Sequence, residues 1–251
     1  MLQGKVIIIT GAARGIGRAY CVQFAKMGAT IIAADIKPCA ETVEEACRHG
    51  GRALGVVADV SDMASTARMV GATNREFGRI DGLVNNAALF GGLHGGHFDT
   101  IDEGEWDDAM AVNVKGIWHC CKAVVPTMRN NGGGSIVNVA SLAATFGMPY
   151  ALHYTASKAA VIGITRGLAR ELGRDDIRVN SIAPSAVATE GSREFFGDKY
   201  ETALDRIKMG QSIQRNLEPL DLVGTVAWLL SDGSRFVTGQ TISVDGGTVL
   251  L

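Results

Sequence analysis

Short apolar runs alternate with longer amphipathic stretches along the whole chain. The runs are rich in β-branched side chains, and they fall at residues 6–9, 30–33, 53–58, 82–84, 135–139, 179–183 and 241–244. Such nearly continuous apolarity is typical of strands covered on both faces, and the helical patterns between the runs supply the crossover connections of a parallel sheet. The pattern predicts a single doubly wound α/β domain over residues 1–251, with about seven parallel strands and helices on both faces.

Helix-start signals support this division. The stretch from Thr100 to Glu103 has the spacing of a capping box, ahead of a helical pattern at residues 106–128. Pro219 suits the first turn of a helix that continues through Leu230. A third helical pattern covers residues 154–172. These signals place long helices between the later strands.

Two stretches lack a regular pattern. Residues 87–100 are rich in glycine and histidine, and residues 187–216 carry Phe195, Phe196 and Tyr200. Long irregular segments in a compact sheet protein commonly contact the ligand. We therefore expect both to be substrate loops, with a lid at about residues 187–216.

Composition and charge exclude several classes of protein. The 251 residues are 47% hydrophobic and 20% charged, which excludes a disordered or fibrous chain. The formal net charge of −2 provides no general attraction for nucleic acid or an anionic membrane. No run approaches the ~18 apolar residues of a membrane helix, and the chain begins without a signal-like segment. We expect a cytoplasmic protein with neither a nucleic-acid nor a membrane partner.

The cysteines and histidines do not predict a metal site. The five cysteines lack the paired spacing of a zinc site or a disulfide framework, and we expect free thiols that are buried or half-buried. His94 and His97 lie close together, with Asp99 following, but two ligands on a glycine-rich loop do not complete a zinc site. We therefore expect no metal.

A glycine-rich loop follows the first predicted strand and precedes a helical pattern. Its sequence, Thr10-Gly11-Ala12-Ala13-Arg14-Gly15-Ile16-Gly17, has the spacing G-x-x-x-G-x-G and differs from the G-x-G-x-x-G fingerprint. Glycines allow a sharp turn and a close approach of the backbone to a pyrophosphate at the amino end of a helix. The context of strand, loop and helix therefore predicts a dinucleotide site.

Asp35 bears on the choice of cofactor. It ends the second predicted strand, 18 residues beyond Gly17, near the offset of about 20 at which a carboxylate accepts hydrogen bonds from an adenosine ribose. A carboxylate there repels a 2′-phosphate, which favours NAD. Arg14 and Lys37 could offset that repulsion, so NADP stays open at this stage.

Three side chains have the spacing of acid/base chemistry. Tyr154 lies 13 residues after Ser141, and Lys158 follows four residues later on the same face of a predicted helix. A neighbouring ammonium and a cationic nicotinamide favour the phenolate, which brings the phenol toward a useful pH. The serine hydroxyl can hydrogen-bond and orient a substrate oxygen.

These features together resemble the short-chain dehydrogenase/reductase family. The match involves residues 10–17, Asp59-Val60, Asn85-Asn86-Ala87-Ala88, Asn113, Ser141, Tyr154 and Lys158, in the family's order. The resemblance implies a single Rossmann domain that binds NAD(H) or NADP(H). It makes Tyr154 the general acid/base and Ser141 the holder of the substrate oxygen. Lys158 would bind the nicotinamide ribose and lower the tyrosine pKa, and Asn113 would fix a water in the proton relay.

The resemblance also implies the remaining cofactor contacts. Asp59 and Val60 would flank the adenine, and Thr189 would lie near the carboxamide. The full expected cofactor-binding set is Gly11, Arg14, Gly15, Ile16, Gly17, Asp35, Asp59, Val60, Asn86, Ala87, Tyr154, Lys158, Pro184, Val187 and Thr189. Two positions depart from the family, because Ala88 and Ser185 stand where glycine is usual. Each adds a small side chain beside the cofactor and removes no catalytic group.

A narrower resemblance concerns the substrate. His153-Tyr154, Ala183-Pro184-Ser185 and residues 219–222 resemble NAD-dependent secondary alcohol dehydrogenases that act on aryl or cyclic alcohols. The expected activity is hydride transfer between NAD(H) and a secondary alcohol or ketone. Two alternatives remain, namely a catalytically silent dinucleotide-binding sensor or scaffold and an NADPH-dependent ketoreductase. The side chains available to line the substrate pocket are mostly apolar; they are Leu142, Ala143, Phe146, Met148, Phe90, Leu93 and Ser185.

Surplus apolar residues predict assembly. In the helical pattern at residues 106–128, apolar side chains fall on more than one side of the wheel; they are Ile117, Trp118, Cys120, Cys121, Val124 and Val125. The chain also ends with two leucines, Leu250 and Leu251. The family resemblance implies a tetramer built on the two long helices and on the last helix and strand. We therefore expect a homotetramer.

Overall fold

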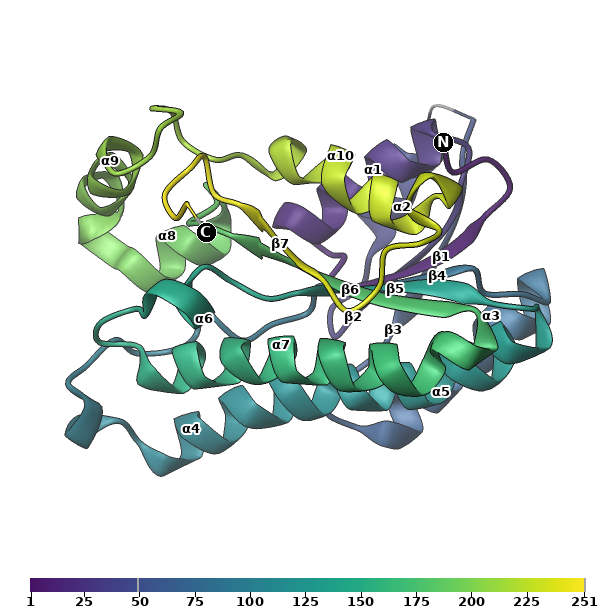
Figure 1. Ribbon diagram of the computed structural model, residues 1–251, viewed down its shortest axis with the longest axis horizontal. Coiled ribbons are helices and arrows are strands. Elements are labelled where there is room, and N and C mark those ends of the chain that lie inside the picture. The colour runs from purple at the N-terminus through teal and green to yellow at the C-terminus, as the bar shows by residue number, and fades with distance from the viewer. Residues whose placement is uncertain (49, 251) are drawn as a thin grey trace.

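Seven parallel strands form one central sheet in the computed structural model, which describes residues 1–48 and 50–250. Their order across the sheet is β3-β2-β1-β4-β5-β6-β7 (Figure 1). The strands are β1 Val6–Thr10, β2 Thr30–Asp35, β3 Arg52–Val57, β4 Gly82–Asn85, β5 Gly134–Val139, β6 Ile177–Pro184 and β7 Thr241–Val244. This topology confirms the expected Rossmann fold.

Helices cover both faces of the sheet. In Figure 1, α1 (Gly15–Lys26), α2 (Ala40–Cys47) and α10 (Pro219–Leu230) lie on one side. The other side carries α3 (Met63–Phe77), α5 (Gly116–Asn130) and α7 (Leu152–Leu172). The strands are apolar at consecutive positions because successive side chains enter different cores.

Strand β1 shows this division directly. Ile7 and Ile9 pack in the cluster that contains residues of α1 and α10, whereas Ile8 packs in the cluster that contains residues of α3 and α5. All three isoleucines have no exposed surface. The two buried layers fix the sheet, and with it the crevice at the carboxyl ends of β1 and β4, where the strand order reverses.

The helical pattern predicted at residues 106–128 is interrupted in the structure. Helix α4 (Glu103–Met110) is followed by a π-helical turn at Ala111–Lys115, and α5 then continues to Asn130. Asp102 caps α4, because its Oδ1 accepts a hydrogen bond from the Glu105 amide at 3.1 Å. Pro219 opens α10 as predicted.

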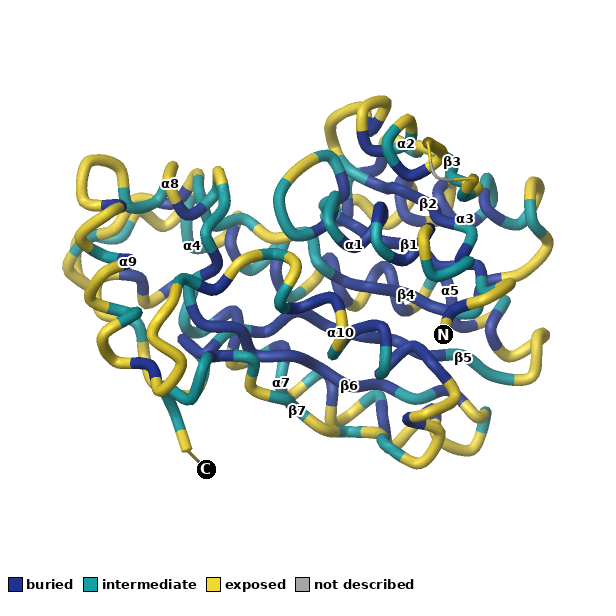
Figure 2. The backbone as a smooth tube through the Cα atoms, turned by 90° about the horizontal axis from the view of Figure 1, so that it is seen from above, coloured by how far each residue is buried: buried dark blue, intermediate teal, exposed yellow. Residues whose placement is uncertain are grey.

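The interpretation of residues 187–216 as irregular is wrong in part. The segment contains α8 (Glu190–Phe196), a 3₁₀ turn at Gly197–Lys199 and α9 (Tyr200–Met209). Thr189 caps α8 by accepting a hydrogen bond from the Ser192 amide at 3.3 Å. Figure 2 shows these two helices at one end of the molecule, more exposed than the strands at its centre.

The smaller elements complete the connections. They are a four-residue helix α6 (Ala143–Phe146) and 3₁₀ turns at Phe98–Thr100, Gly173–Asp175 and Asp232–Ser234. Within the described residues, no helix combines the length and apolarity needed to cross a membrane. Four of the cysteines are buried, but Cys47 is exposed, so the expectation of buried or half-buried thiols is wrong for that residue.

Candidate active site

The glycine loop packs directly against the end of β4. Asn86 Nδ2 donates to the carbonyl oxygens of Thr10 and Gly11 at 2.9 and 3.1 Å. Gly17 has no room for a side chain, because a Cβ there would overlap the Gly11 carbonyl oxygen. A Cβ on Gly11 would in turn lie 2.8 Å from the Cα of Ala87. These contacts explain why glycine is needed at both positions.

The amino end of α1 suits an anion. In the part of the chain that the structure describes, no side chain caps α1 and no acidic residue occupies its first turn. Its first backbone N–H groups face the cleft with the positive end of the helix dipole. This free end, the glycine spacing and Asp35 together fit the pyrophosphate and ribose of a dinucleotide.

Asp35 ends β2 and lines this cleft. Its Oδ2 accepts a hydrogen bond from the Ala13 amide at 2.9 Å, and its Oδ1 accepts one from the Lys37 amide at 2.9 Å. Asp59 accepts hydrogen bonds from the amide and the hydroxyl of Ser61 at 2.8 and 2.7 Å. Both carboxylates are therefore held in place by the backbone around them.

Most of the predicted cofactor residues line this one cleft. The structure brings together Gly11, Arg14, Gly15, Ile16, Asp35, Asp59, Val60, Asn86, Ala87 and Thr189 along its walls. Gly17 is buried beneath the loop, and Pro184 and Val187 lie at and beyond the end of β6, outside that lining. Ala88, one of the two departures from the family, also lines the cleft.

The three predicted catalytic side chains converge beside the cleft. Tyr154 and Lys158 lie one turn apart on α7, and Lys158 Nζ is 5.7 Å from the centre of the Tyr154 ring. Ser141, which follows β5, lies close to Tyr154, and its hydroxyl acts to lower the pKa of the phenol. Lys158 Nζ also donates to the Val139 carbonyl at 2.8 Å, so the ammonium is anchored in the core.

Burial governs the charge of this pair. The residue Tyr154 is only partly exposed and its phenol is enclosed, so burial raises its pKa to about 12 despite the opposing hydrogen bond from Ser141. Burial lowers the pKa of Lys158 to about 8. In the chain alone, desolvation raises the tyrosine pKa, and the expected lowering by Lys158 is absent.

Asn113 lies in the π-helical turn, and its side chain is fully engaged. Its Oδ1 accepts a hydrogen bond from the Leu89 amide at 2.8 Å, and its Nδ2 donates to the Leu89 carbonyl and to Ser157 Oγ at 3.1 and 3.0 Å. Ser157 donates in turn to the Tyr154 carbonyl at 2.8 Å. Asn113 therefore connects the loop after β4 to the helix that carries the phenol.

An aromatic cluster covers the phenol. Phe90 contacts the Tyr154 ring with 4.7 Å between centroids, and it stacks on Phe195 of α8 at 4.5 Å. Phe196 meets both phenylalanine rings edge to face. Phe90 also lines the cleft beside the glycine loop, so the cluster joins that cleft to Tyr154. Phe146, another residue of the expected wall, is instead 71% exposed.

Several residues of the site were not predicted from the sequence. Ser157 and Glu194 carry no motif, and they become visible only through their contacts with Asn113 and Arg14. His94 pairs with Glu105 and His97 with Asp99, and no group of three potential metal ligands occurs among the described residues. The histidine loop is therefore a surface network of hydrogen bonds.

Comparison with known proteins identifies the family. A family model described as Enoyl-(Acyl carrier protein) reductase matches residues 11–249. The chain is 40% identical to the 3-oxoacyl-[acyl-carrier-protein] reductase of Thermotoga maritima, with 99% of each chain covered. It is 39% identical to the (2S)-[(R)-hydroxy(phenyl)methyl]succinyl-CoA dehydrogenase subunit of Thauera aromatica, covering 99% of this chain and 98% of the relative.

Solved structures agree with this assignment. A putative short-chain alcohol dehydrogenase from Sinorhizobium meliloti superimposes with a TM-score of 0.92 at 34% identity, covering 98% of this chain and 97% of that one. The 3-ketoacyl-(acyl-carrier-protein) reductase of Brucella melitensis, complexed with NADH, gives a TM-score of 0.88 at 32% identity over 100% of both chains.

Proposed function

The chain belongs to the short-chain dehydrogenase/reductase family, and we propose that it is an NAD-dependent oxidoreductase of secondary alcohols and ketones. The observation that carries this proposal is the convergence of Ser141, Tyr154 and Lys158 beside a dinucleotide cleft that has Asp35 at its far end. A bound nicotinamide supplies or accepts the hydride at its C4.

The chain's own groups manage the oxygen and its proton. In the reductive direction Tyr154 Oη donates its proton to the ketone oxygen as charge develops there, and in oxidation its phenolate accepts the alcohol proton. Ser141 Oγ donates a hydrogen bond to the same oxygen and orients it. The Lys158 ammonium stabilises the phenolate when tyrosine is deprotonated. The buried position excludes water from this exchange.

We propose bulky aryl or cyclic substrates. The cluster of Phe90, Phe195 and Phe196 offers flat apolar faces next to the phenol. Two of the similar proteins have names in keeping with such substrates: one is named for a hydroxy(phenyl)methyl-succinyl-CoA substrate, and another is a levodione reductase. A panel of aryl, cyclic and short aliphatic alcohols and ketones, followed by NADH absorbance with both cofactors, tests cofactor and substrate class together.

A second candidate is reduction of a 3-oxoacyl group with NADPH. Its support is the full-length similarity to a protein named as a 3-oxoacyl-[acyl-carrier-protein] reductase, together with Arg14 and Lys37 in the cleft. A 3-oxoacyl thioester is therefore added to the panel, and its efficient turnover with NADPH would favour this candidate. A chain that binds cofactor but turns over no member of the panel would instead be a sensor or scaffold.

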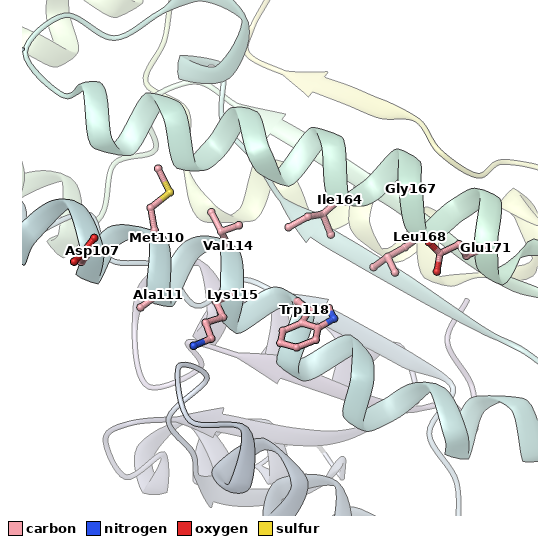
Figure 3. Close-up of a pocket in the computed structure, with 10 residues that line it drawn as sticks. All are labelled: Asp107, Met110, Ala111, Val114, Lys115, Trp118, Ile164, Gly167, Leu168 and Glu171. Carbon is pink, nitrogen blue, oxygen red and sulfur yellow. The ribbon is translucent and has the colours of Figure 1, made fainter.

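We also propose a homotetramer. Five of the six apolar residues named from the sequence do not support this proposal, because they are buried in the chain's own core; they are Ile117, Cys120, Cys121, Val124 and Val125. The sixth, Trp118, is 46% exposed. An outer groove between α7 and the α4–α5 segment carries the proposal instead (Figure 3). The groove is lined mainly by apolar side chains, which include Met110, Val114, Trp118, Ile164 and Leu168.

The free cysteines bear on the cellular compartment of the protein. All five cysteines are unpaired in the described structure, and thiols stay reduced most readily in the cytosol. We therefore propose a cytoplasmic enzyme. For the homotetramer, Leu250 is 85% exposed and so does not pack on the chain's own core, and Leu251 lies outside the described residues.

A further inference from the structure

An ion pair crosses the mouth of the dinucleotide cleft. Both terminal nitrogens of Arg14, in the glycine loop, face the two carboxylate oxygens of Glu194, in α8 of the lid. The contact between Nη2 and Oε2 measures 2.7 Å. This geometry is a bidentate fork, the arrangement in which a guanidinium binds a carboxylate or a phosphate most strongly.

Glu194 is held in this position by its neighbours. A Cβ on Gly91 would collide with Glu194 Oε2 and would lie 3.0 Å from the Gly191 carbonyl oxygen. The missing side chain at Gly91 therefore leaves the space that Glu194 uses to reach the glycine loop. The two side chains are about half exposed, at 44% and 45%, so solvent and ions can compete for the pair.

Arg14 also lies close to Asp35 through the backbone of the glycine loop. Asp35 accepts a hydrogen bond from the amide of Ala13, the residue directly before Arg14. Arg14, Asp35 and Lys37 line the same cleft. If Asp35 binds the adenosine ribose, a 2′-phosphate on that ribose would lie within the surroundings of the Arg14 guanidinium.

We propose that Glu194 is a positioning residue for cofactor selection. Its carboxylate binds the two terminal nitrogens of Arg14, which would otherwise be available to bind a 2′-phosphate. The inference rests on the proposed NAD preference and adds to Asp35 a second determinant, supplied by the lid. Asp35 repels the phosphate directly, whereas Glu194 acts by engaging the one arginine of the loop. The selected ligand is a dinucleotide without a 2′-phosphate.

The charges of the surroundings agree with this role. The hydrogen bonds that Arg14 donates to Glu194 raise the pKa of Arg14, and the nearby carboxylates of Glu190 and Asp35 act in the same direction. The hydrogen bond from Arg14 lowers the pKa of Glu194, and Lys37 contributes to that lowering. The pair therefore stays ionised at neutral pH, where cofactor is selected.

The test compares NADPH and NADH binding, followed by nucleotide fluorescence, in the unmodified protein and in Glu194→Gln. We expect the Kd for NADPH to fall by about threefold to tenfold, with the Kd for NADH changed by less than about twofold. A general loosening of the lid would weaken both nucleotides, so the difference between them distinguishes the two effects. Glu201→Gln is the matched control, because Glu201 lies on the lid and pairs with Arg193 instead.

Arg14→Gln and the double variant complete the cycle. If Glu194 acts through Arg14, the gain in NADPH affinity disappears in the Arg14→Gln background. The inference is overturned if Glu194→Gln shows no gain in NADPH affinity, or if the gain is equally large in the Arg14→Gln background. A preference for NADPH in the unmodified protein would refute the proposed NAD dependence by itself, and the shift produced by Glu194→Gln would still decide the role of Glu194.

Discussion

The ring of Phe90 lies against the ring of Tyr154, with 4.7 Å between their centroids. Since Phe90 also stacks on Phe195 of α8, it connects the 187–216 segment to the Tyr154 ring. A flat apolar substrate group placed beside the phenol can stack on these rings, which is the physical reason to expect aryl or cyclic substrates.

Phe195→Ala tests this expectation. Removal of the lid ring should raise KM for an aryl ketone by about tenfold, because an aromatic contact and its buried area are lost, while kcat changes by less than about threefold. Steady-state kinetics with an aryl and a short aliphatic ketone give the comparison. Phe98→Ala is the control, because Phe98 is 65% exposed and lies outside the cluster. High activity on a small hydroxy acid, with none on aryl or cyclic alcohols, would refute the proposed substrate class.

Tyr154→Phe should abolish nearly all turnover and leave NADH binding largely intact. The variant keeps the ring that packs on Phe90 and loses the acidic hydroxyl, so kcat should fall by about 10²-fold to 10⁴-fold or more. Tyr150→Phe, at a residue that is 67% exposed, should remain active. A Tyr154→Phe enzyme that retains a third of its activity contradicts the assigned role.

Lys158 should make stability depend on pH. Its pKa is about 8 in the folded chain and 10.5 as the ordinary value, so between these pH values the unfolded chain binds more protons. The free energy of unfolding then rises with pH across this window, by about 1 to 3 kcal/mol. Tyr154 acts in the opposite direction above pH 10, because its folded pKa is about 12.

Urea unfolding at pH 7.5 and 9.5 checks whether the free energy of unfolding rises with pH because of Lys158. The Lys158→Met variant is the comparison. The difference between the two proteins isolates this lysine from other groups that titrate in the same window. The increase in the free energy of unfolding between the two pH values should be present in the unmodified protein and absent from Lys158→Met. An equal increment in both proteins would show that Lys158 does not carry it.

Asp35→Asn should relax the preference for NAD. The substitution keeps the shape of the side chain and an acceptor for the Ala13 amide, but it removes the negative charge beside the ribose. The ratio of kcat/KM for NADP to that for NAD should increase by about tenfold or more. Equal or higher efficiency with NADP in the unmodified enzyme would rule out the preference itself.

The sequence predicted the sheet well because its signal is local. Ile7, Ile8 and Ile9 are all buried, and a β-branched run between helical patterns indicates a strand covered on both faces. The π-helical turn at Ala111–Lys115 has no such local signal. Its Asn113 side chain bonds to Leu89 and Ser157, which are remote in the sequence, so tertiary contacts accompany the break.

The residues of the site also fall into two groups, those with a local sequence signal and those placed by remote contacts. Motif spacing identified the residues that line the cleft, since each follows a strand or lies on one helix face. The contacts of Phe90 with Phe195 and of Arg14 with Glu194 join the lid to distant loops, and no spacing rule predicts them. The high pKa of Tyr154 was missed because it depends on enclosure of the phenol by the folded chain.

The last prediction concerns the outer groove between α7 and the α4–α5 segment. Trp118 is 46% exposed there, beside Ile164 and Leu168, and a second chain would remove these apolar groups from water. Trp118→Arg should therefore shift a tetramer toward smaller species, as measured by light scattering at micromolar concentration. Met63→Arg, at an exposed methionine of α3 outside the groove, should leave the assembly unchanged. Removal of residues 249–251 should weaken the assembly if the carboxyl end joins a second interface. A mass that matches a single 26.4 kDa chain in the unmodified protein would refute the tetramer.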